Sequence, residues 1–170
     1  VSSNTTYYAI TRKDAVTLTA KYNANGASLS STANQTCTIA ATYNGTVQST
    51  SCTITAPTIT RSGYTIIGYN TTSTSTSNNT SYNTSSKVLT LTSSNNNSTW
   101  YAITSKGVTI TFNKNGASTQ TNSSGTAVSD TTVTRTCTMY NTNTSCNVTS
   151  PSITAASGFG VVGYNTSSSA

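Results

Sequence analysis

The chain has 170 residues, the length of one ordinary domain or of two small ones. Serine, threonine and asparagine make up about half of it, hydrophobic residues make up 33%, and histidine is absent. The only acidic residues, Asp14 and Asp130, lie far apart in the sequence. Acid–base catalysis usually needs a histidine or paired carboxylates, and zinc sites of the His/Cys type need histidine. The composition therefore argues against an enzyme and predicts no metal and no cofactor.

The net charge of +6 results from the lack of acids rather than from a basic cluster. Arg12 and Lys13 are adjacent, whereas the other cations are scattered along the chain. A nucleic-acid binder normally carries a basic run or stripe, so we expect no nucleic-acid partner. No hydrophobic run approaches the length that crosses a bilayer, so we expect no membrane span in this segment.

Disorder is the alternative that such a polar composition raises. Aromatic and β-branched residues nevertheless recur in short alternating runs, and threonine itself fits the pleated surface of a strand. Residues 15–23 show this alternation most clearly, with Val16, Leu18, Ala20 and Tyr22 on one face. A period of two predicts a half-buried strand, and the Asn25-Gly26 dipeptide then predicts a turn.

The four cysteines predict two disulfides within hairpins. Residues 38–43 form a candidate strand, Asn44-Gly45 a candidate type I′ turn, and the return arm leads to Cys52. Cys37 and Cys52 then face each other, and Cys137 and Cys146 flank a shorter loop. Four cysteines allow three connectivities, of which we favour Cys37–Cys52 and Cys137–Cys146. Disulfides imply an oxidising, extracytoplasmic compartment.

Further along the chain, strands are again expected. Residues 63–70 and 158–165 have the pattern of central strands, and residues 71–86 that of a solvated loop. Residues 88–91 and 100–103 are predicted to be the last strands. No stretch shows convincing helical periodicity, although residues 28–35 have room for one short helical turn.

The most informative feature is an internal repeat. The sextet Thr6-Tyr7-Tyr8-Ala9-Ile10-Thr11 returns as Thr99-Trp100-Tyr101-Ala102-Ile103-Thr104. Five further segments return in the same order, displaced by about 90 to 100 residues. Residues 16–28, 36–38, 50–52, 56–60 and 62–71 match residues 108–118, 136–138, 144–146, 150–154 and 157–166.

The phase of this repeat divides the chain. Residues 15–105 form a complete repeat, and residues 106–170 form a second one that stops before its last strand. Residues 1–14 then correspond to the closing strand of a preceding repeat. Either the sequence is a window on a longer array, or the incomplete repeat is closed by the first strand of another molecule.

These landmarks resemble the Listeria–Bacteroides repeat, a module related to the B repeat of the internalins. The matching motifs are Asn-x-Asn-Gly, Tyr-Asn-Gly, Pro-Thr-x-x-Arg-x-Gly-Tyr-x-x-x-Gly-Tyr and Trp-Tyr-Ala, at residues 23–26, 43–45, 57–69 and 100–102. The second copy departs from them, because Ala156 stands where Arg61 does and residues 140–142 lack the glycine. Family members commonly have tryptophan at the positions of Tyr69 and Tyr164, and the cysteine pair is not typical of the family.

The resemblance implies a β-grasp-like module of bacterial cell-surface proteins. We expect an all-β fold, or a β-rich α+β fold, built of tandem modules of about 90 residues that are each closed by one disulfide. We also expect a structural role in an extracellular filament, fibre or cell-surface stalk; the alternative is an adhesin module that recognises a glycan or a host protein.

Assembly follows from the phase of the repeat. The expected partners are other copies of the chain, joined head-to-tail by strand addition, or further repeats of the same chain. The expected assembly strand comprises Tyr7, Tyr8, Ala9, Ile10 and Thr11. In this interpretation, the first fourteen residues belong to the sheet of a neighbouring repeat and not to the repeat that follows them in the sequence.

Overall fold

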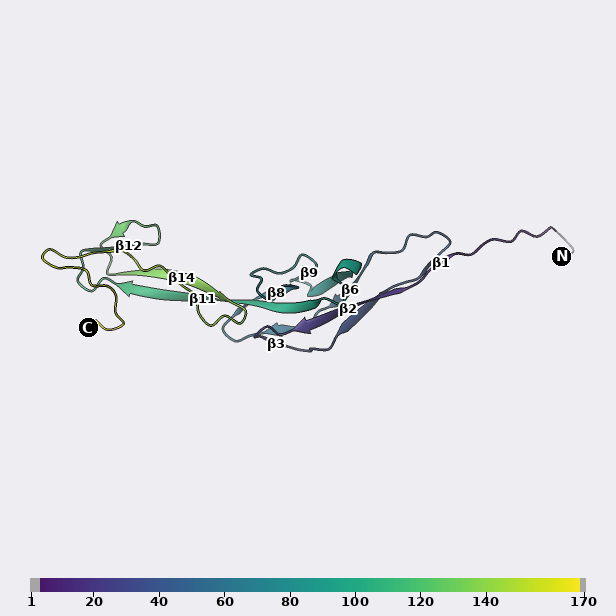
Figure 1. Ribbon diagram of the computed structural model, residues 1–170, viewed down its shortest axis with the longest axis horizontal. Helices are drawn as coiled ribbons and strands as arrows, with labels where there is room; N and C mark the ends of the chain where they lie inside the picture. The colour runs from purple at the N-terminus through teal and green to yellow at the C-terminus, as the bar shows by residue number, and fades with distance from the viewer. Residues whose placement is uncertain (1–3, 169–170) are drawn as a thin grey trace. The chain divides into compact units, whose positions relative to one another are not determined.

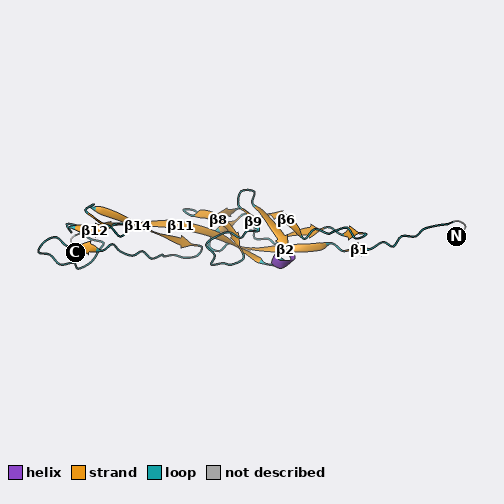
Figure 2. Cartoon of the chain, turned by 90° about the horizontal axis from the view of Figure 1, so that it is seen from above, coloured by secondary structure: helices purple, strands orange, loops and turns teal. Residues whose placement is uncertain are grey.

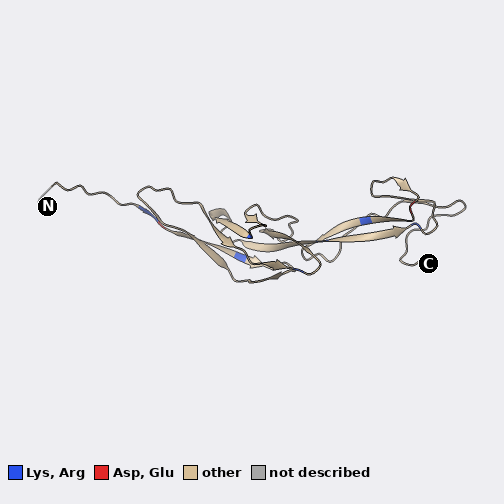
Figure 3. Cartoon of the chain, turned by 180° about the vertical axis from the view of Figure 1, so that it is seen from behind, with Lys and Arg blue, Asp and Glu red and all other residues tan. Residues whose placement is uncertain are grey.

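The computed structural model describes residues 4–168, and the prediction of an all-β protein is confirmed (Figure 1). Strands make up its regular structure, and the one helical element of these residues is the short 3-10 turn Ser93–Asn95 (Figure 2). The α+β alternative is therefore wrong for this part of the chain. Charged positions are few in both units described below (Figure 3).

The chain divides into two compact units. Unit 1 comprises the described residues up to Ser105 together with Tyr140–Thr142. Unit 2 comprises Lys106–Met139 and the described residues from Asn143 onward. Strand β11 (Thr99–Asn113) contributes its first part to unit 1 and its second part to unit 2.

The first sheet of unit 1 is built around the start of β11. Strand β2 (Val16–Asn23) buries Leu18, Ala20 and Tyr22, the face that the alternating pattern predicts. It pairs with β4 (Gln35–Ile39) on one side and in parallel with β11 on the other. Strand β8 (Thr65–Asn70) pairs antiparallel with the far side of β11. The strand predicted within residues 63–70 is therefore confirmed, but its central place is wrong, because among the described residues β8 pairs with β11 alone.

A second sheet covers the first. It consists of β6 (Ser51–Thr55), β10 (Val88–Thr92) and β9 (Tyr82–Asn83), in that order of pairing. Strand β10 packs on β2, and β6 packs on β4. The core between the sheets consists of buried aliphatic and aromatic side chains, chiefly Leu18, Tyr22, Tyr69, Tyr82, Leu89, Leu91 and Trp100. The loop predicted for residues 71–86 is thus not wholly solvated, since Tyr82 lies in this core.

The Cys37–Cys52 disulfide is present, but the hairpin predicted around it is wrong. Cys37 lies in β4 and Cys52 in β6, which pair with β2 and β10 instead of with each other. The bond therefore joins the two packed sheets. The Asn44-Gly45 turn does form, and it follows β5 (Thr42–Tyr43), whose partner is β1 (Arg12–Lys13).

A small antiparallel pair completes unit 1. It joins β3 (Ser28–Leu29) to β7 (Ile59–Thr60). Residues 28–35 therefore begin as a strand, and the helical turn allowed for them does not form. Their threonine- and serine-rich neighbourhood favours local side-chain turns over a helix, as the bond from the Ala33 amide to the Ser31 hydroxyl shows.

Unit 2 has fewer paired strands. Strand β14 (Thr132–Tyr140) lies beside β11, and β12 (Thr119–Thr121) pairs with β13 (Ala127–Val128) and β15 (Ile153–Thr154). The Cys137–Cys146 disulfide closes the loop that follows β14. Residues 158–165 form no strand, so the prediction of a central strand there is wrong. Among the described residues, no strand pairs with this segment as β11 pairs with β8.

Gly68 and Gly163 provide a matched test of the packing in unit 1. Both residues have a φ that side chains rarely adopt, +139° and +143°. A Cβ at Gly68 lies 2.9 Å from the Tyr82 ring, whereas a Cβ at Gly163 meets nothing within 4 Å. Gly68→Ala should therefore cost about 1–3 kcal/mol more stability than Gly163→Ala, because only the first adds overpacking to backbone strain. Urea denaturation followed by circular dichroism measures both losses, and equal losses contradict the packing described.

Candidate assembly site

The segment predicted to mediate assembly is fully exposed. Residues 4–11 form no strand, and pairing begins only at β1. The side chains of Tyr7, Tyr8 and Ile10 are 79%, 83% and 76% exposed. Three large apolar side chains so close together in sequence are an unusual exposure for a soluble protein. Their role in assembly remains a prediction.

The end of this segment is held by the Asn44 turn. The Asn44 amide donates to the Thr11 carbonyl oxygen at 2.9 Å, and the Thr11 amide donates to Asn44 Oδ1 at 3.3 Å. Asn44 adopts a φ of +55°, which asparagine tolerates better than most residues. The turn therefore fixes where residues 7–11 leave unit 1.

The same pair of hydrogen bonds occurs at the second sextet. The Asn141 amide donates to the Thr104 carbonyl oxygen at 2.9 Å, and the Thr104 amide donates to Asn141 Oδ1 at 3.1 Å. Asn141 has a φ of +51°. Thr11 and Thr104 each end a matching sextet, and Asn44 and Asn141 each follow a tyrosine. Local geometry at the two sites is therefore closely alike.

The surroundings of the two sextets differ sharply. Trp100, Ala102 and Ile103 are completely buried in unit 1, between β2 and β8. Their strand completes the first sheet and supplies the side chain at the centre of the core. Residues 7–11 have the same sequence pattern and none of this burial.

The aromatic pair beside Trp100 has a counterpart in unit 2. Tyr22 of β2 and Tyr69 of β8 contact each other with ring centroids 5.4 Å apart. Counted back from the Asn-Gly turns, Phe112 stands where Tyr22 does. Tyr164 stands where Tyr69 does, because both follow a glycine and precede Asn-Thr. Phe112 and Tyr164 are also in contact, at 4.9 Å. The flanks of a closing strand are thus present in unit 2.

An open groove of about 1020 Å³ lies along these flanks. It runs over the second part of β11 and residues 153–168. Its apolar lining includes Ile110, Phe112, Phe159, Val161, Val162 and Tyr164. Phe159 and Val162 are 78% and 105% exposed, whereas their counterparts in unit 1, Tyr64 and Ile67, are half-buried. The groove therefore leaves an apolar surface without a covering strand.

Burial also separates the tyrosines of the two units. Burial raises the pKa of Tyr22, Tyr69 and Tyr82 above the ordinary value, and the neighbouring tyrosines add to the rise for Tyr22 and Tyr69. Burial raises the pKa of Tyr164 as well, but the positive charge of Arg135 opposes that rise. Tyr164 donates to Gln120 Oε1 at 3.3 Å, which keeps its ring turned toward β12.

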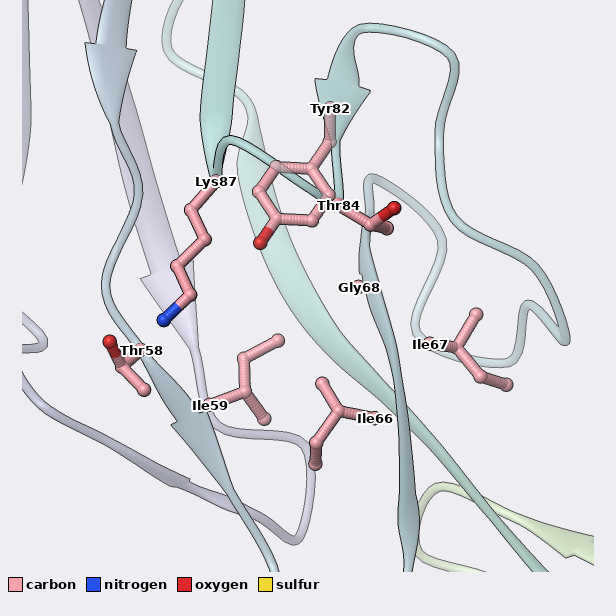
Figure 4. A pocket seen from close by; sticks show the side chains of 8 residues that line it. All are labelled: Thr58, Ile59, Ile66, Ile67, Gly68, Tyr82, Thr84 and Lys87. Carbon is pink, nitrogen blue, oxygen red and sulfur yellow. The ribbon is translucent and has the colours of Figure 1, made fainter.

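A second, smaller cavity lies in unit 1 beside Tyr82, with a volume of about 240 Å³ (Figure 4). Ile59 and Ile66 face it from one side, and the Lys87 side chain reaches toward Thr58. Its lining carries one cation and no carboxylate. Such a lining has no acid–base pair, so it offers space for a small apolar group without chemistry to act on it.

Residues 4–168 contain no cluster of three or more histidine, cysteine or acidic residues that could hold a metal ion. Among the same residues, no helix is long and apolar enough to cross a membrane. Comparisons with protein-family models, with curated proteins and with solved structures found no match to this chain.

The repeat that stops before its last strand already predicted an open place for a strand in residues 106–170, but sequence reasoning missed the asparagines that bond to the two sextets. The Asn44-Gly45 dipeptide indicated a turn, but nothing in it showed that the amide would hold Thr11. Asn141 lacks the following glycine, so its sequence does not indicate a turn, although it is 4% exposed and has nearly the same φ as Asn44. Alignment of Phe112 and Tyr164 with Tyr22 and Tyr69 was a further signal, which locates the residues on either side of the open place.

The buried tyrosines predict a loss of stability in alkali. Their folded pKa values exceed about 10, the value in an unfolded chain, so unfolding releases protons above that pH. The contribution of these tyrosines to stability should be constant below pH 10 and should fall as the pH rises past it. Absorbance of ionised tyrosine, recorded on native and urea-unfolded protein, measures this. Tyr69→Phe should remove one of the tyrosines that ionise at higher pH in the native protein. If all ten tyrosines of the native protein ionise at the same pH as in the unfolded protein, the burial described is contradicted.

Proposed function

We propose that this chain is a structural module of an extracellular bacterial filament, fibre or cell-surface stalk, and that its copies join head-to-tail. Residues 7–11 of one copy enter the groove of unit 2 in the preceding copy and complete its sheet. The module repeats along the chain with a length of about 90 residues, as the resemblance to the Listeria–Bacteroides repeat also implies.

One observation carries the proposal. The sextet at residues 99–104 is buried in unit 1, whereas the matching residues 6–11 are exposed and unit 2 has an open groove in the matching place. Strand addition satisfies backbone groups on both sides of the added strand and seats alternate side chains in the groove. A donor at one end and an acceptor at the other make the contact heterologous, and a heterologous contact that does not close produces a filament.

The size of the contact sets its expected strength. Burying two tyrosines and an isoleucine removes about 400 Å² from the donor side, and the groove contributes a similar area. A total near 800 Å² is below the range of stable interfaces, so side chains alone give a weak contact. The backbone ladders on both edges of the strand supply the rest. Association should therefore depend on protein concentration.

Composition and covalent structure suit an extracellular role. Two disulfides are typical of proteins that fold in an oxidising compartment. Trypsin cleaves after lysine and arginine, of which the chain has only eight, so cleavage by proteases of this specificity is limited. The adhesin alternative needs a ligand site on a single copy, and the features above favour contacts between copies.

The assembly test replaces Ile10 with a charged residue. Ile10→Asp places a carboxylate where the proposed contact buries an aliphatic side chain, and should reduce association by about 100-fold or more. Val47→Asp is the control, because Val47 is 91% exposed and lies outside residues 7–11. Sedimentation over a concentration series, with electron microscopy of the most concentrated samples, measures the outcome.

Three outcomes are distinguishable. Chains of copies that Ile10→Asp abolishes and Val47→Asp preserves support the proposal. Equal loss with both variants shows general hydrophobic association and contradicts it. A wild-type protein that stays monomeric at every concentration also contradicts it.

A further inference from the structure

We propose that Asn44 fixes the register of the contact between copies, by donating a hydrogen bond to the Ser168 carbonyl oxygen of the acceptor copy. This inference rests on the proposed head-to-tail function and names a positioning residue within it. Its basis is the set of hydrogen bonds that Asn141 makes in unit 1.

Asn141 uses all of its polar groups there. Its Nδ2 donates to the carbonyl oxygens of Ser73 and Ser75 at 2.9 and 2.8 Å. Its Oδ1 and backbone amide bond Thr104, as described above. The side chain is 4% exposed. Asn141 thus joins the end of the closing strand to the loop that follows β8, and this pairing allows one register only.

Asn44 makes half of this set. Its backbone amide and Oδ1 bond Thr11, the counterpart of Thr104. Among the described residues, none accepts a hydrogen bond from its Nδ2, and the side chain is exposed. The counterpart of Ser73 is Ser168, two residues beyond Thr166 as Ser73 is two beyond Thr71. The missing acceptor therefore lies in the loop that borders the groove of another copy.

The acceptor side holds the complementary half. In unit 1, Asn25 Nδ2 donates to the Ser73 carbonyl oxygen at 2.8 Å and to the Ala102 carbonyl oxygen at 3.0 Å. In unit 2, Asn115 Nδ2 already donates to the Ser168 carbonyl oxygen at 3.1 Å. The position of Ala102 in the first sextet belongs to Ala9. Insertion of the donor strand therefore brings the Ala9 carbonyl oxygen to Asn115.

Charge is compatible with this seating. Residues 6–11 carry no charge, and Lys114 is the one charged residue among those lining the groove. An uncharged strand thus enters without desolvating an ion. The contact also lacks two hydrogen bonds that unit 1 has. Arg61 donates to Thr104 Oγ1 and to the Asn141 carbonyl oxygen, but Ala156 stands at its place beside the groove. Without the arginine, the register between copies depends more on the hydrogen bonds of Asn44 and Asn115.

The register follows from unit 1 residue by residue. Tyr101 lies opposite Asn70 of β8, and Trp100 lies beside Tyr22 of β2. Transferred to the contact between copies, Tyr8 lies opposite Asn165 and Tyr7 lies beside Phe112. A shift by one residue turns every side chain of the strand to the other face and separates Asn44 from Ser168.

The test replaces Asn44 with aspartate. Asn44→Asp keeps an oxygen that accepts from the Thr11 amide and keeps tolerance of positive φ, but it removes the Nδ2 donor. It should weaken association of copies by about 10- to 100-fold, because the contact loses one hydrogen bond and a carboxylate comes to lie beside the Ser168 carbonyl oxygen. Unfolding of the dilute protein should change little. Sedimentation over a concentration series and urea unfolding of dilute protein give the two readings.

Asn141→Asp is the matched variant. It removes the same donor where the bonds lie within one chain. It should lower the stability of the dilute, monomeric protein and leave the association of the folded copies largely intact. The same chemical change should thus reduce association at Asn44 and stability at Asn141.

Cross-linking reads the register directly and does not depend on either asparagine variant. Single variants Tyr8→Cys and Asn165→Cys are mixed under mild oxidation; facing residues of a strand pair lie within disulfide reach. A linked dimer of the two variants is expected, whereas Tyr8→Cys mixed with Val161→Cys should give none.

The outcomes separate this inference from the proposed function. Association that Ile10→Asp abolishes but Asn44→Asp leaves unchanged overturns the role of Asn44 and preserves the filament. Preferential linking of Tyr8→Cys to Val161→Cys overturns the register. A wild-type protein without association overturns both proposals together.

Discussion

A central strand needs backbone partners on both edges and a covered apolar side, and the rest of this structure depends on that requirement. In unit 1, the start of β11 is such a strand, because Trp100 and Ile103 are buried and both of its edges are paired. The packing of the second sheet, the contact of Tyr22 with Tyr69 and the closure by Asn141 all depend on that strand. In unit 2, Phe112 and Tyr164 meet without such a strand, and apolar residues stay exposed beside them.

Much of unit 1 could be predicted from alternation alone. Val16 to Tyr22 and Val88 to Leu91 form strands because one face of each is apolar and the other is threonine-rich. Pairing was the part that failed, because the partners of a strand depend on contacts remote in sequence. The Asn44-Gly45 turn suggested a local hairpin, yet Cys37 and Cys52 belong to strands of two sheets that pack on each other. A disulfide shows that two cysteines are close, but it does not determine which strands are joined by hydrogen bonds.

Unit 2 shows why sequence similarity overestimates local structure. Residues 158–165 repeat the pattern of β8, but β8 is a strand because β11 lies beside it. Most strand stability comes from such neighbours rather than from intrinsic preference. The candidate site was predictable in part for the same reason. The sextet at residues 6–11 was visible as a repeat, whereas the asparagine contacts at its end required the backbone conformation of Asn44 and Asn141.

Amide hydrogen exchange over a concentration series tests the central claim most directly. The claim is that residues 7–11 and residues 160–165 are two halves of one sheet in different copies. The account predicts that amides in both segments exchange rapidly in dilute protein and become protected together as concentration rises, while those of β2 and β10 stay protected throughout. Protection that appears in neither segment, or in only one of them, contradicts the account.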